Sequence, residues 1–398
     1  MDTKTSNFSQ FLLWFGAAVS IAEILTGAII APLGLTDGVL AIILGHIIGG
    51  VIFYFTGLIG AKSKLPAIES TRISFGKYGS YLFSILNILQ LLGWTAVMII
   101  SGAKAMNVVS IQIFGFSNDA VWSILIGALI CVWILIGVKN LTKINIVAIS
   151  SLFVCCIILS FTIFSGNSTS STIEEGMSFG SAVELAAIMP LSWLPLISDY
   201  TKDVRSEKPG TFSSTIGYFI GSCFMYIIGL GAAIYTGTSD IASILTGAGL
   251  GIAALLIVIL STVTTTFLDA YSAGISFLNI NKKVSDKAAG LVVCVLGIII
   301  AIFTPIEEFE DFLYLIGSVF APLFAILITD YFLLKVTDIN ETKPMNLINI
   351  IIWIIGVIIY RQLMTLDTPL GTTLPVMLII SLICIIINGG KKLCLKKS

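Results

Sequence analysis

Long apolar stretches that carry almost no charge fill most of this 398-residue chain. A helix needs about 20 mostly apolar residues to cross the hydrocarbon core of a bilayer. Twelve stretches reach this length, at 11–31, 38–61, 80–108, 120–138, 145–165, 180–200, 212–236, 247–278, 288–304, 311–335, 347–364 and 373–388. Because each is a continuous apolar run and not an alternating segment, helices are expected and not barrel strands. The chain is predicted to be an all-α integral membrane protein with twelve transmembrane helices.

The composition excludes an ordinary soluble enzyme. Only 11% of the residues are charged, whereas a soluble domain carries about 25%. No polar stretch is long enough to form a separate water-soluble core, so residues 1–398 are predicted to form a single transmembrane domain. The formal net charge of -1 provides no basic surface for nucleic acid. The expected surroundings are the lipid bilayer, with no obligatory protein partner.

Basic residues alternate along the connections between these stretches. Of the 21 Lys and Arg residues, 19 lie before the first stretch or after an even-numbered one, and the odd-numbered connections are neutral or acidic. The positive-inside rule then predicts that both termini lie in the cytoplasm, as for a protein of the cell membrane. The two exceptions, Lys104 and Arg361, lie toward the outer ends of their helices, where long side chains can reach the interface.

Motifs for metal, nucleotide or disulfide chemistry are missing from the sequence. None of the seven cysteines forms a C-x-x-C pair, so they are interpreted as small packing residues. The single histidine, His46, cannot build a zinc site alone; a buried structural role is the favoured interpretation, and a proton relay is the alternative. No phosphate-binding motif is present, so neither ATP-driven transport nor a cofactor is expected.

Two prolines interrupt the apolar stretch at 180–200. Pro190 and Pro195 each remove a backbone donor and obstruct a preceding carbonyl, so a continuous helix is not expected there. Broken helices at membrane depth are tolerated where the freed backbone lines a cavity or is buried in protein, and in transporters they mark the binding site. A purely structural proline kink is the alternative.

A carboxylate lies in the middle of the first stretch. Glu23 is surrounded by small residues and has no basic residue within its span. An ionisable group at this depth costs a few kcal/mol on insertion scales, and therefore usually faces an internal cavity or a partner. A functional role is favoured, with a protonated structural hydrogen bonder as the alternative.

The stretch at 247–278 combines hydroxyls with an acid. Five of the six residues from Ser261 to Thr266 carry hydroxyls, and Asp269 follows them. Hydroxyl and carbonyl oxygens suit an alkali cation, although Ser and Thr also bond to the preceding turn or join helices. In the stretch at 80–108, Trp94 lies near the middle and offers a flat face. Such a face can stack on a planar ligand or simply fill volume.

Together these segments resemble the nucleobase:cation symporter-1 family of twelve-helix secondary transporters. Further residues carry the resemblance: Trp14–Gly16, Gly49–Gly50, Leu65–Pro66, Arg72, Phe75–Gly79, Ser198–Lys202 and Asp330–Tyr331. The segment Met189–Thr201 is similar to the branch of hydroxymethylpyrimidine transporters, which salvage a thiamine precursor and are related to cytosine permeases.

The resemblance implies a LeuT-like five-plus-five inverted repeat, over about 11–165 and 180–335. The first and sixth helices are then broken around a central site, and two peripheral helices follow at about 347–388. The implied substrate-binding residues are Glu23, Trp94, Met98, Ser192, Trp193 and Asp269. The implied sodium site uses carbonyls near Val19 and Ala22 together with the hydroxyls of Thr264 and Thr265.

The sequence also departs from the family pattern. Pro190 stands where relatives place a tryptophan, with Trp193 three residues later, and Met98 replaces a glutamine. Two carboxyls, Glu23 and Asp269, replace amides. A protonated carboxyl offers one donor and one acceptor, which matches the edge of an aminopyrimidine; an ionised one could instead hold a protonated ligand.

The sequence is therefore interpreted as a symporter that imports hydroxymethylpyrimidine by alternating access, coupled to Na⁺ or H⁺. A cytosine or purine/allantoin-type permease is the alternative within the family. From other classes, an intramembrane enzyme could use Glu23 and Asp269 as an acid–base pair, and a channel is a third possibility.

Overall fold

The computed structural model describes residues 4–136, 138–165, 176–237, 251–281, 283–304, 309–340, 342 and 344–390. Inside the helices, side chains are described except at 138–145, 162–165, 251–254, 257, 258, 261, 264 and 286. Within these limits the regular secondary structure is helical, apart from an isolated parallel β-bridge between Thr5 and Val204. The predicted all-α class is therefore confirmed.

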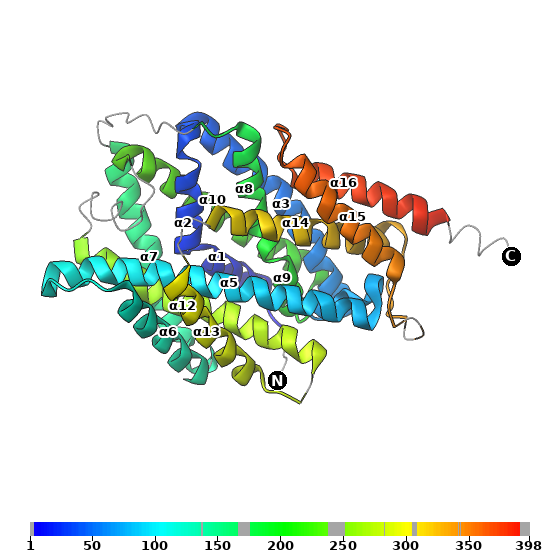
Figure 1. The fold of residues 1–398 in the computed structure, drawn as a ribbon, viewed down its shortest axis with the longest axis horizontal. Helices are drawn as coiled ribbons and strands as arrows, with labels where there is room; N and C mark the ends of the chain where they lie inside the picture. The colour runs from blue at the N-terminus through cyan, green and yellow to red at the C-terminus, as the bar shows by residue number, and fades with distance from the viewer. Residues whose placement is uncertain are drawn as a thin grey trace.

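Helix occupies all twelve predicted apolar stretches, as far as the chain is described (Figure 1). In chain order the helices are α1 (Asn7–Ala18), α2 (Ile21–Ile29), η1 (Ala31–Leu33), α3 (Leu35–Ser63), α4 (Ala67–Ser70), α5 (Arg72–Phe114), α6 (Asp119–Ile136), α7 (Val138–Ser165), α8 (Phe179–Ser192), α9 (Leu194–Thr201), α10 (Glu207–Thr236), α12 (Gly251–Ile280), α13 (Asp286–Phe303), α14 (Phe309–Ile328), η3 (Thr329–Leu333), α15 (Leu347–Leu363), α16 (Thr373–Cys384) and η4 (Ile385–Gly389).

Not every helix is long enough to cross a membrane on its own. By length and composition, six spans in the described chain can do so: α3, α5, α6, α8 with α9, α10, and α14 with η3. The bent pair α1 and α2 adds a seventh when it is taken as one broken span. The count of twelve transmembrane helices therefore stays a prediction.

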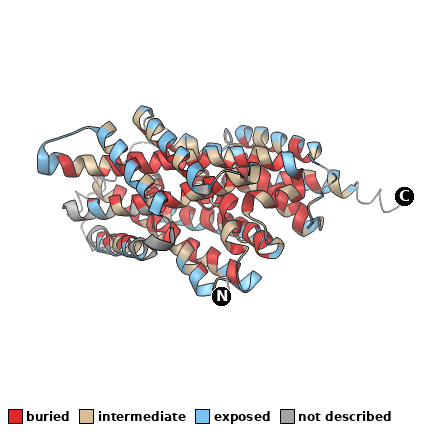
Figure 2. Ribbon diagram, turned by 90° about the horizontal axis from the view of Figure 1, so that it is seen from below, coloured by how far each residue is buried: buried red, intermediate tan, exposed pale blue. Residues whose placement is uncertain are grey.

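The outward faces of these helices are apolar. On α3, the side chains of Leu40, Ile47 and Val51 are 54%, 49% and 53% exposed. Intervals of seven and four residues place them on one face of the helix. Figure 2 shows buried residues concentrated inside the molecule, with exposed positions along its outer helices. A large apolar surface of this kind marks an interaction site, here with lipid.

The two halves of the chain repeat the same packing. α1 packs along α10, and α8 packs along α3. If each helix is replaced by the helix five predicted spans earlier or later in the chain, the α1–α10 contact becomes the α8–α3 contact. Under the same exchange, the contacts of α5 with α12 and of α3 with α10 remain the same pairs. α15 and α16 lie side by side at one edge of the molecule (Figure 1). The division into a five-plus-five repeat with two additional helices stays a prediction.

Small residues allow α3 and α8 to approach closely. A Cβ atom on Gly45 would lie 2.5 Å from Cβ of Ala186, and one on Gly49 would lie 2.8 Å from the carbonyl oxygen of Ala187. Close backbone approach at small residues is a usual way for membrane helices to pack. Gly49, one of the two adjacent glycines that carry the family resemblance, therefore has a packing role.

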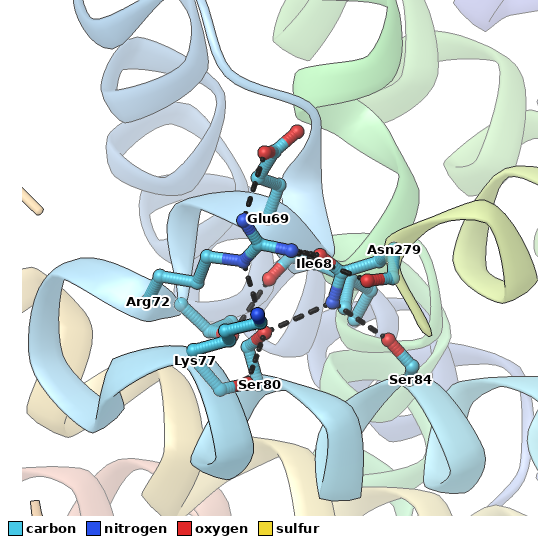
Figure 3. Close-up of polar contacts among 8 residues, drawn as sticks. Ile68, Glu69, Arg72, Lys77, Ser80, Ser84 and Asn279 are labelled. Carbon is cyan, nitrogen blue, oxygen red and sulfur yellow. Dashed lines mark hydrogen bonds and ion pairs between the residues drawn. The ribbon is translucent and has the colours of Figure 1, made fainter. Parts of the chain in front are cut away.

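A cluster of polar contacts, called the elbow below, joins the start of α5 to the end of α12 (Figure 3). The Arg72 guanidinium pairs with Glu69 at 3.2 Å and donates to the backbone and side-chain oxygens of Asn279 at 3.2 and 2.5 Å. The Asn279 amide donates in turn to Ser80 and Ser84, each at 2.9 Å. These contacts tie the basic connection after the second predicted span to the end of α12.

Candidate functional site

The first predicted helix is interrupted near the middle of its span. α1 ends at Ala18 and α2 begins at Ile21, and the two axes differ by 55°. Between them, Val19 and Ser20 leave the helical conformation, with ψ angles of 78° and 161°. A helix end leaves its last carbonyls and first N–H groups without partners inside the helix. The break therefore brings carbonyl oxygens of α1 and N–H groups of α2 to the same point.

The second break is shallower than the two prolines predict. Only Trp193 separates α8 from α9, and it stays near helical geometry at φ -92° and ψ -4°. Residues 179–201 consequently still qualify together as one 23-residue span. The physical reason is that Pro195 falls in the first turn of α9, where a missing N–H costs nothing. Pro190 alone interrupts the interior of α8.

A cavity lies where the two breaks meet α5 and α12. Its free volume is about 30 Å³ in this conformation. Residues from all four elements line it, namely Ser20, Ala22, Glu23, Leu91, Trp94, Met98, Met189, Ser192, Trp193, Leu196, Thr265 and Asp269.

The structure brings eight of the ten predicted site residues to this cavity. They are Ala22, Glu23, Trp94, Met98, Ser192, Trp193, Thr265 and Asp269. Val19 lies at the end of α1 and is not among the lining residues, and the side chain of Thr264 lies outside the described residues. Four further lining residues, Ser20, Leu91, Met189 and Leu196, carry no chemical signal in the sequence. Their spacing from Glu23, Trp94 and Trp193 by three or four residues could have indicated them.

Asp269 presents a buried acid to the cavity. Its side chain is 7% exposed, and no hydrogen bond or ion pair to it is found among the described residues. No Lys or Arg lines the cavity. Buried polar groups are nearly always hydrogen-bonded, and a buried charge without a partner is costly. A ligand that brings a hydrogen-bond donor or a positive charge would satisfy this carboxyl group.

Glu23 is held in place by hydrogen bonds to two hydroxyl groups. Its Oε1 accepts a hydrogen bond from the Tyr218 hydroxyl at 2.7 Å, and its Oε2 lies 2.7 Å from the Ser222 hydroxyl. Both partners lie on α10, and the Glu23 side chain is 1% exposed. These hydrogen bonds fit the interpretation of Glu23 as a structural hydrogen bonder, and its place in the cavity wall fits the interpretation of a functional residue.

The two tryptophans are fixed edge-on by other rings. Trp94 meets Phe309 and Phe312 of α14 at centroid distances of 5.8 and 5.5 Å. Trp193 meets Trp14 at 5.5 Å with the ring planes 89° apart. Edge-to-face contacts of this kind are favourable and orient the rings. They hold Trp94 and Trp193 in the cavity wall without stacking the two on each other.

The oxygens predicted for a cation differ in their availability. The Thr265 hydroxyl is buried and has no hydrogen-bond partner among the described residues. The Ala22 carbonyl accepts a hydrogen bond from the Thr26 hydroxyl at 2.8 Å and belongs to the first turn of α2. Thr265 is therefore free to take a ligand, whereas the Ala22 oxygen is engaged within α2.

Comparison with known proteins identifies the family. A family model described as a permease for cytosine/purines, uracil, thiamine and allantoin matches residues 2–382. The chain belongs to this permease family. It is therefore a multi-pass membrane transporter and not an enzyme, which excludes the alternative of an intramembrane acid–base catalyst.

Individual relatives agree with this assignment. The permease is 25% identical over 302 residues to the cytosine permease of Escherichia coli (strain K12), a match that covers 74% of this chain and 70% of the relative. It is 22% identical over 379 residues to the hydantoin permease of Microbacterium maritypicum, covering 86% and 77% of the two chains.

Solved structures share the fold. The inward-facing conformation of Mhp1 matches with a TM-score of 0.83 at 18% identity, covering 96% of this chain and 90% of that one. Mhp1 in a closed conformation with bromovinylhydantoin bound matches with a TM-score of 0.79 at 19% identity, covering 96% and 92%. The type of helical fold implied by the resemblance is therefore confirmed.

Proposed function

We propose that this permease is a secondary active symporter that imports a planar aminopyrimidine, with hydroxymethylpyrimidine, a thiamine precursor, as the first candidate. The observation that carries the proposal is the Asp269 carboxyl, which has no partner among the described residues and lies in a cavity walled by Trp94 and Trp193. The family assignment and the cytosine permease relative support a flat, nitrogen-rich substrate.

The chemistry of the cavity favours a ligand with N–H donors. The ring nitrogen and adjacent amino group of an aminopyrimidine complement a protonated carboxyl, whereas a protonated ring complements a carboxylate. Asp269 would make this contact, and Trp94 would stack on the ring face at about 1–3 kcal/mol. Glu23, Met98 and Ser192 would complete the wall around the ligand. A ligand with its own carboxylate finds no Lys or Arg among the lining residues.

The coupling ion is proposed to be Na⁺ or H⁺. Hard cations prefer oxygen ligands, and the unpartnered Thr265 hydroxyl supports a Na⁺ site completed by the Val19 carbonyl and the Thr264 hydroxyl. Because the Ala22 carbonyl already accepts the Thr26 hydroxyl, it is left out of the proposed set. Alternatively, a cavity carboxyl would carry a proton itself.

Transport is proposed to occur by rocking of the two repeats around the cavity. The exchange symmetry of the helix contacts supports a five-plus-five repeat with α15 and α16 as peripheral helices. The alternation of basic connections supports twelve spans with both termini in the cytoplasm of a cell membrane. Two broken helices that meet at one central site are typical of alternating-access transporters, and a channel does not need them.

A cytosine or purine/allantoin-type permease is the second candidate. The 25% identity to the cytosine permease of Escherichia coli favours it. Both candidates use the same cavity and the same mechanism, so they differ only in the ligand that Asp269 and its neighbours select.

Uptake into proteoliposomes tests the proposal. Radiolabelled hydroxymethylpyrimidine is supplied under an inward Na⁺ gradient, an inward H⁺ gradient or neither, with unlabelled cytosine or thiamine as competitors. Accumulation of unchanged solute with one gradient is expected. Accumulation of radiolabelled cytosine in a parallel sample, without accumulation of hydroxymethylpyrimidine, would assign the second candidate, and equilibration without accumulation would identify a channel.

A matched pair of variants tests the role of Asp269. Asp269→Asn should weaken uptake roughly 10- to 150-fold, because a hydrogen bond to a charged group contributes about 1.5–3 kcal/mol. Asp37→Asn, which changes an exposed acid at the start of α3, is the control and should leave uptake unchanged. Equal uptake by both variants would contradict the assignment of Asp269.

A further inference from the structure

A chain of short contacts links Glu23 to the single histidine of the protein. The Ser222 Oγ atom lies 2.7 Å from Glu23 Oε2 and 2.5 Å from His46 Nε2. His46 Nδ1 lies 2.8 Å from the carbonyl oxygen of Ile42. All three side chains are at most 1% exposed. The chain therefore runs from α2 through α10 to α3 within the protein interior.

The three side chains Glu23, Ser222 and His46 must share a limited number of hydrogens. The Ile42 carbonyl can only accept, so His46 Nδ1 must carry a hydrogen. Ser222 has one hydroxyl hydrogen but two short contacts, to Glu23 and to His46. One more hydrogen must therefore lie either on Glu23 Oε2 or on His46 Nε2. In the first case both side chains are neutral; in the second they form a carboxylate and an imidazolium.

We propose that Glu23, Ser222 and His46 form an internal proton-sharing unit, which moves one proton from Glu23 to His46 when a donor-bearing substrate binds in the cavity. The inference rests on the proposed function, which it extends to histidine and serine residues that lie behind the cavity wall. His46 is a positioning residue in this scheme, because it acts on the substrate through Ser222 and Glu23.

The proton shift is balanced within the chain. The Glu23 Oε2–H bond breaks as its hydrogen passes to Ser222 Oγ, while the Ser222 hydroxyl hydrogen passes to His46 Nε2. No proton enters or leaves the protein, and the number of hydrogen bonds in the unit is unchanged. Glu23 changes from a hydrogen-bond donor into a carboxylate that accepts a hydrogen bond from a substrate N–H group.

The surroundings favour the neutral arrangement in the absence of substrate. Separated buried charges cost several kcal/mol unless additional hydrogen bonds satisfy them. The titratable groups that face the unit from other elements supply no positive charge. They are Tyr218, Cys223 and Tyr226 on α10, and Asp269 of α12 across the cavity. A substrate donor supplies the missing stabilisation of the Glu23 carboxylate.

Nitrogen NMR of protein labelled with ¹⁵N-histidine tests the resting arrangement. Because His46 is the single histidine, its imidazole resonances need no assignment. Without ligand, Nδ1 should be protonated and Nε2 unprotonated. Ser222→Ala should shift the Nε2 resonance, whereas Ser214→Ala removes another buried hydroxyl of α10 and should not. A protonated Nε2 without ligand, or an Nε2 resonance unmoved by Ser222→Ala, would overturn the proposal.

The same measurement with saturating ligand tests the shift itself. With hydroxymethylpyrimidine, or with cytosine in a parallel sample, Nε2 should become protonated in the wild type and stay unprotonated in Glu23→Gln. Calorimetry on the same samples reports binding. Binding without protonation of Nε2 would overturn the proposal. If neither pyrimidine binds, the proposed substrate class fails, and the ligand-free spectra still decide whether the unit exists.

A double-mutant cycle separates this role from simple packing. His46→Gln should weaken ligand binding roughly tenfold, or about 1.4 kcal/mol, but by less than about twofold in a Glu23→Gln background. Tyr226→Phe is the packing control. The Tyr226 ring lies 4.8 Å from the His46 ring, and its hydroxyl donates to the Leu185 carbonyl oxygen and takes no part in the Glu23–Ser222–His46 contacts. Additive losses in the cycle would mean that His46 acts only as a structural residue.

Discussion

Glu184 lies on α8 and joins this helix to α15 and α16. Its carboxylate accepts hydrogen bonds from the backbone N–H groups of Thr372 and Thr373, at 2.6 and 2.7 Å, and from the Thr373 hydroxyl at 2.7 Å. The Tyr360 hydroxyl is a fourth donor. Glu184 is 1% exposed, and it caps the start of α16, where helix N–H groups have no partner within the helix.

Replacing Glu184 by Gln should destabilise the protein strongly. The single amide oxygen of Gln can serve about two of the four donors, and its NH₂ group would face the others. Each hydrogen bond to a charged group contributes about 1.5–3 kcal/mol, so the loss of two corresponds to about 3–6 kcal/mol. Tyr360→Phe removes one donor and leaves the carboxylate otherwise satisfied. Its expected cost is about 1.5–3 kcal/mol.

Thermal unfolding in lipid nanodiscs, followed by circular dichroism, measures this order. The Tm should fall from the wild type to Tyr360→Phe and further to Glu184→Gln. Glu69→Gln is the control, because its partly exposed ion pair with Arg72 is worth at most about 1 kcal/mol. A Glu184→Gln protein that unfolds at the temperature of Tyr360→Phe would refute the argument that four donors depend on one carboxylate.

Three further predictions follow from the cavity, the helix packing and the elbow. Trp94→Ala should weaken substrate binding roughly 5- to 150-fold through loss of stacking, with Trp94→Phe less affected; equal calorimetric affinities would contradict a stacking role. Gly45→Val should lower the Tm and the yield of folded protein, because even a Cβ lies 2.5 Å from that of Ala186 on α8; an unchanged Tm would show that α3 and α8 can separate at no cost. Arg72→Ala and Asn279→Ala should each lower the Tm, with a double variant less affected than the sum, since both remove the same hydrogen bonds at the elbow; strictly additive losses would disprove that coupling.

The sequence alone was sufficient to predict the helices and most of the wall of the cavity. Apolar runs of membrane-spanning length are a local property of the chain, because a helix in lipid satisfies its own backbone groups. An acid such as Glu23 or Asp269 within such a run is equally conspicuous, since its burial is costly. Eight of the ten site residues that the family resemblance implied lie around one cavity, and their binding roles remain predictions.

The depth of the helix breaks depended on local geometry that the sequence left open. Two prolines predict a strong break between α8 and α9, yet Trp193 stays near helical conformation. No proline precedes Ser20, yet α1 and α2 differ in direction by 55°. Composition identifies residues that permit a break, but the backbone angles adopted at Val19, Ser20 and Trp193 decide how far the axis turns.

Only the tertiary structure decided which groups each acid meets. Glu23 finds Tyr218 and Ser222 about 200 residues further along the chain, and Ser222 in turn finds His46 on α3. Asp269 lies in the same cavity and finds no partner among the described residues. In the sequence both are simply acids in apolar helices. Hydrogen bonds act only over about 3 Å, so the difference between a shared proton and a free ligand contact arises when the helices pack.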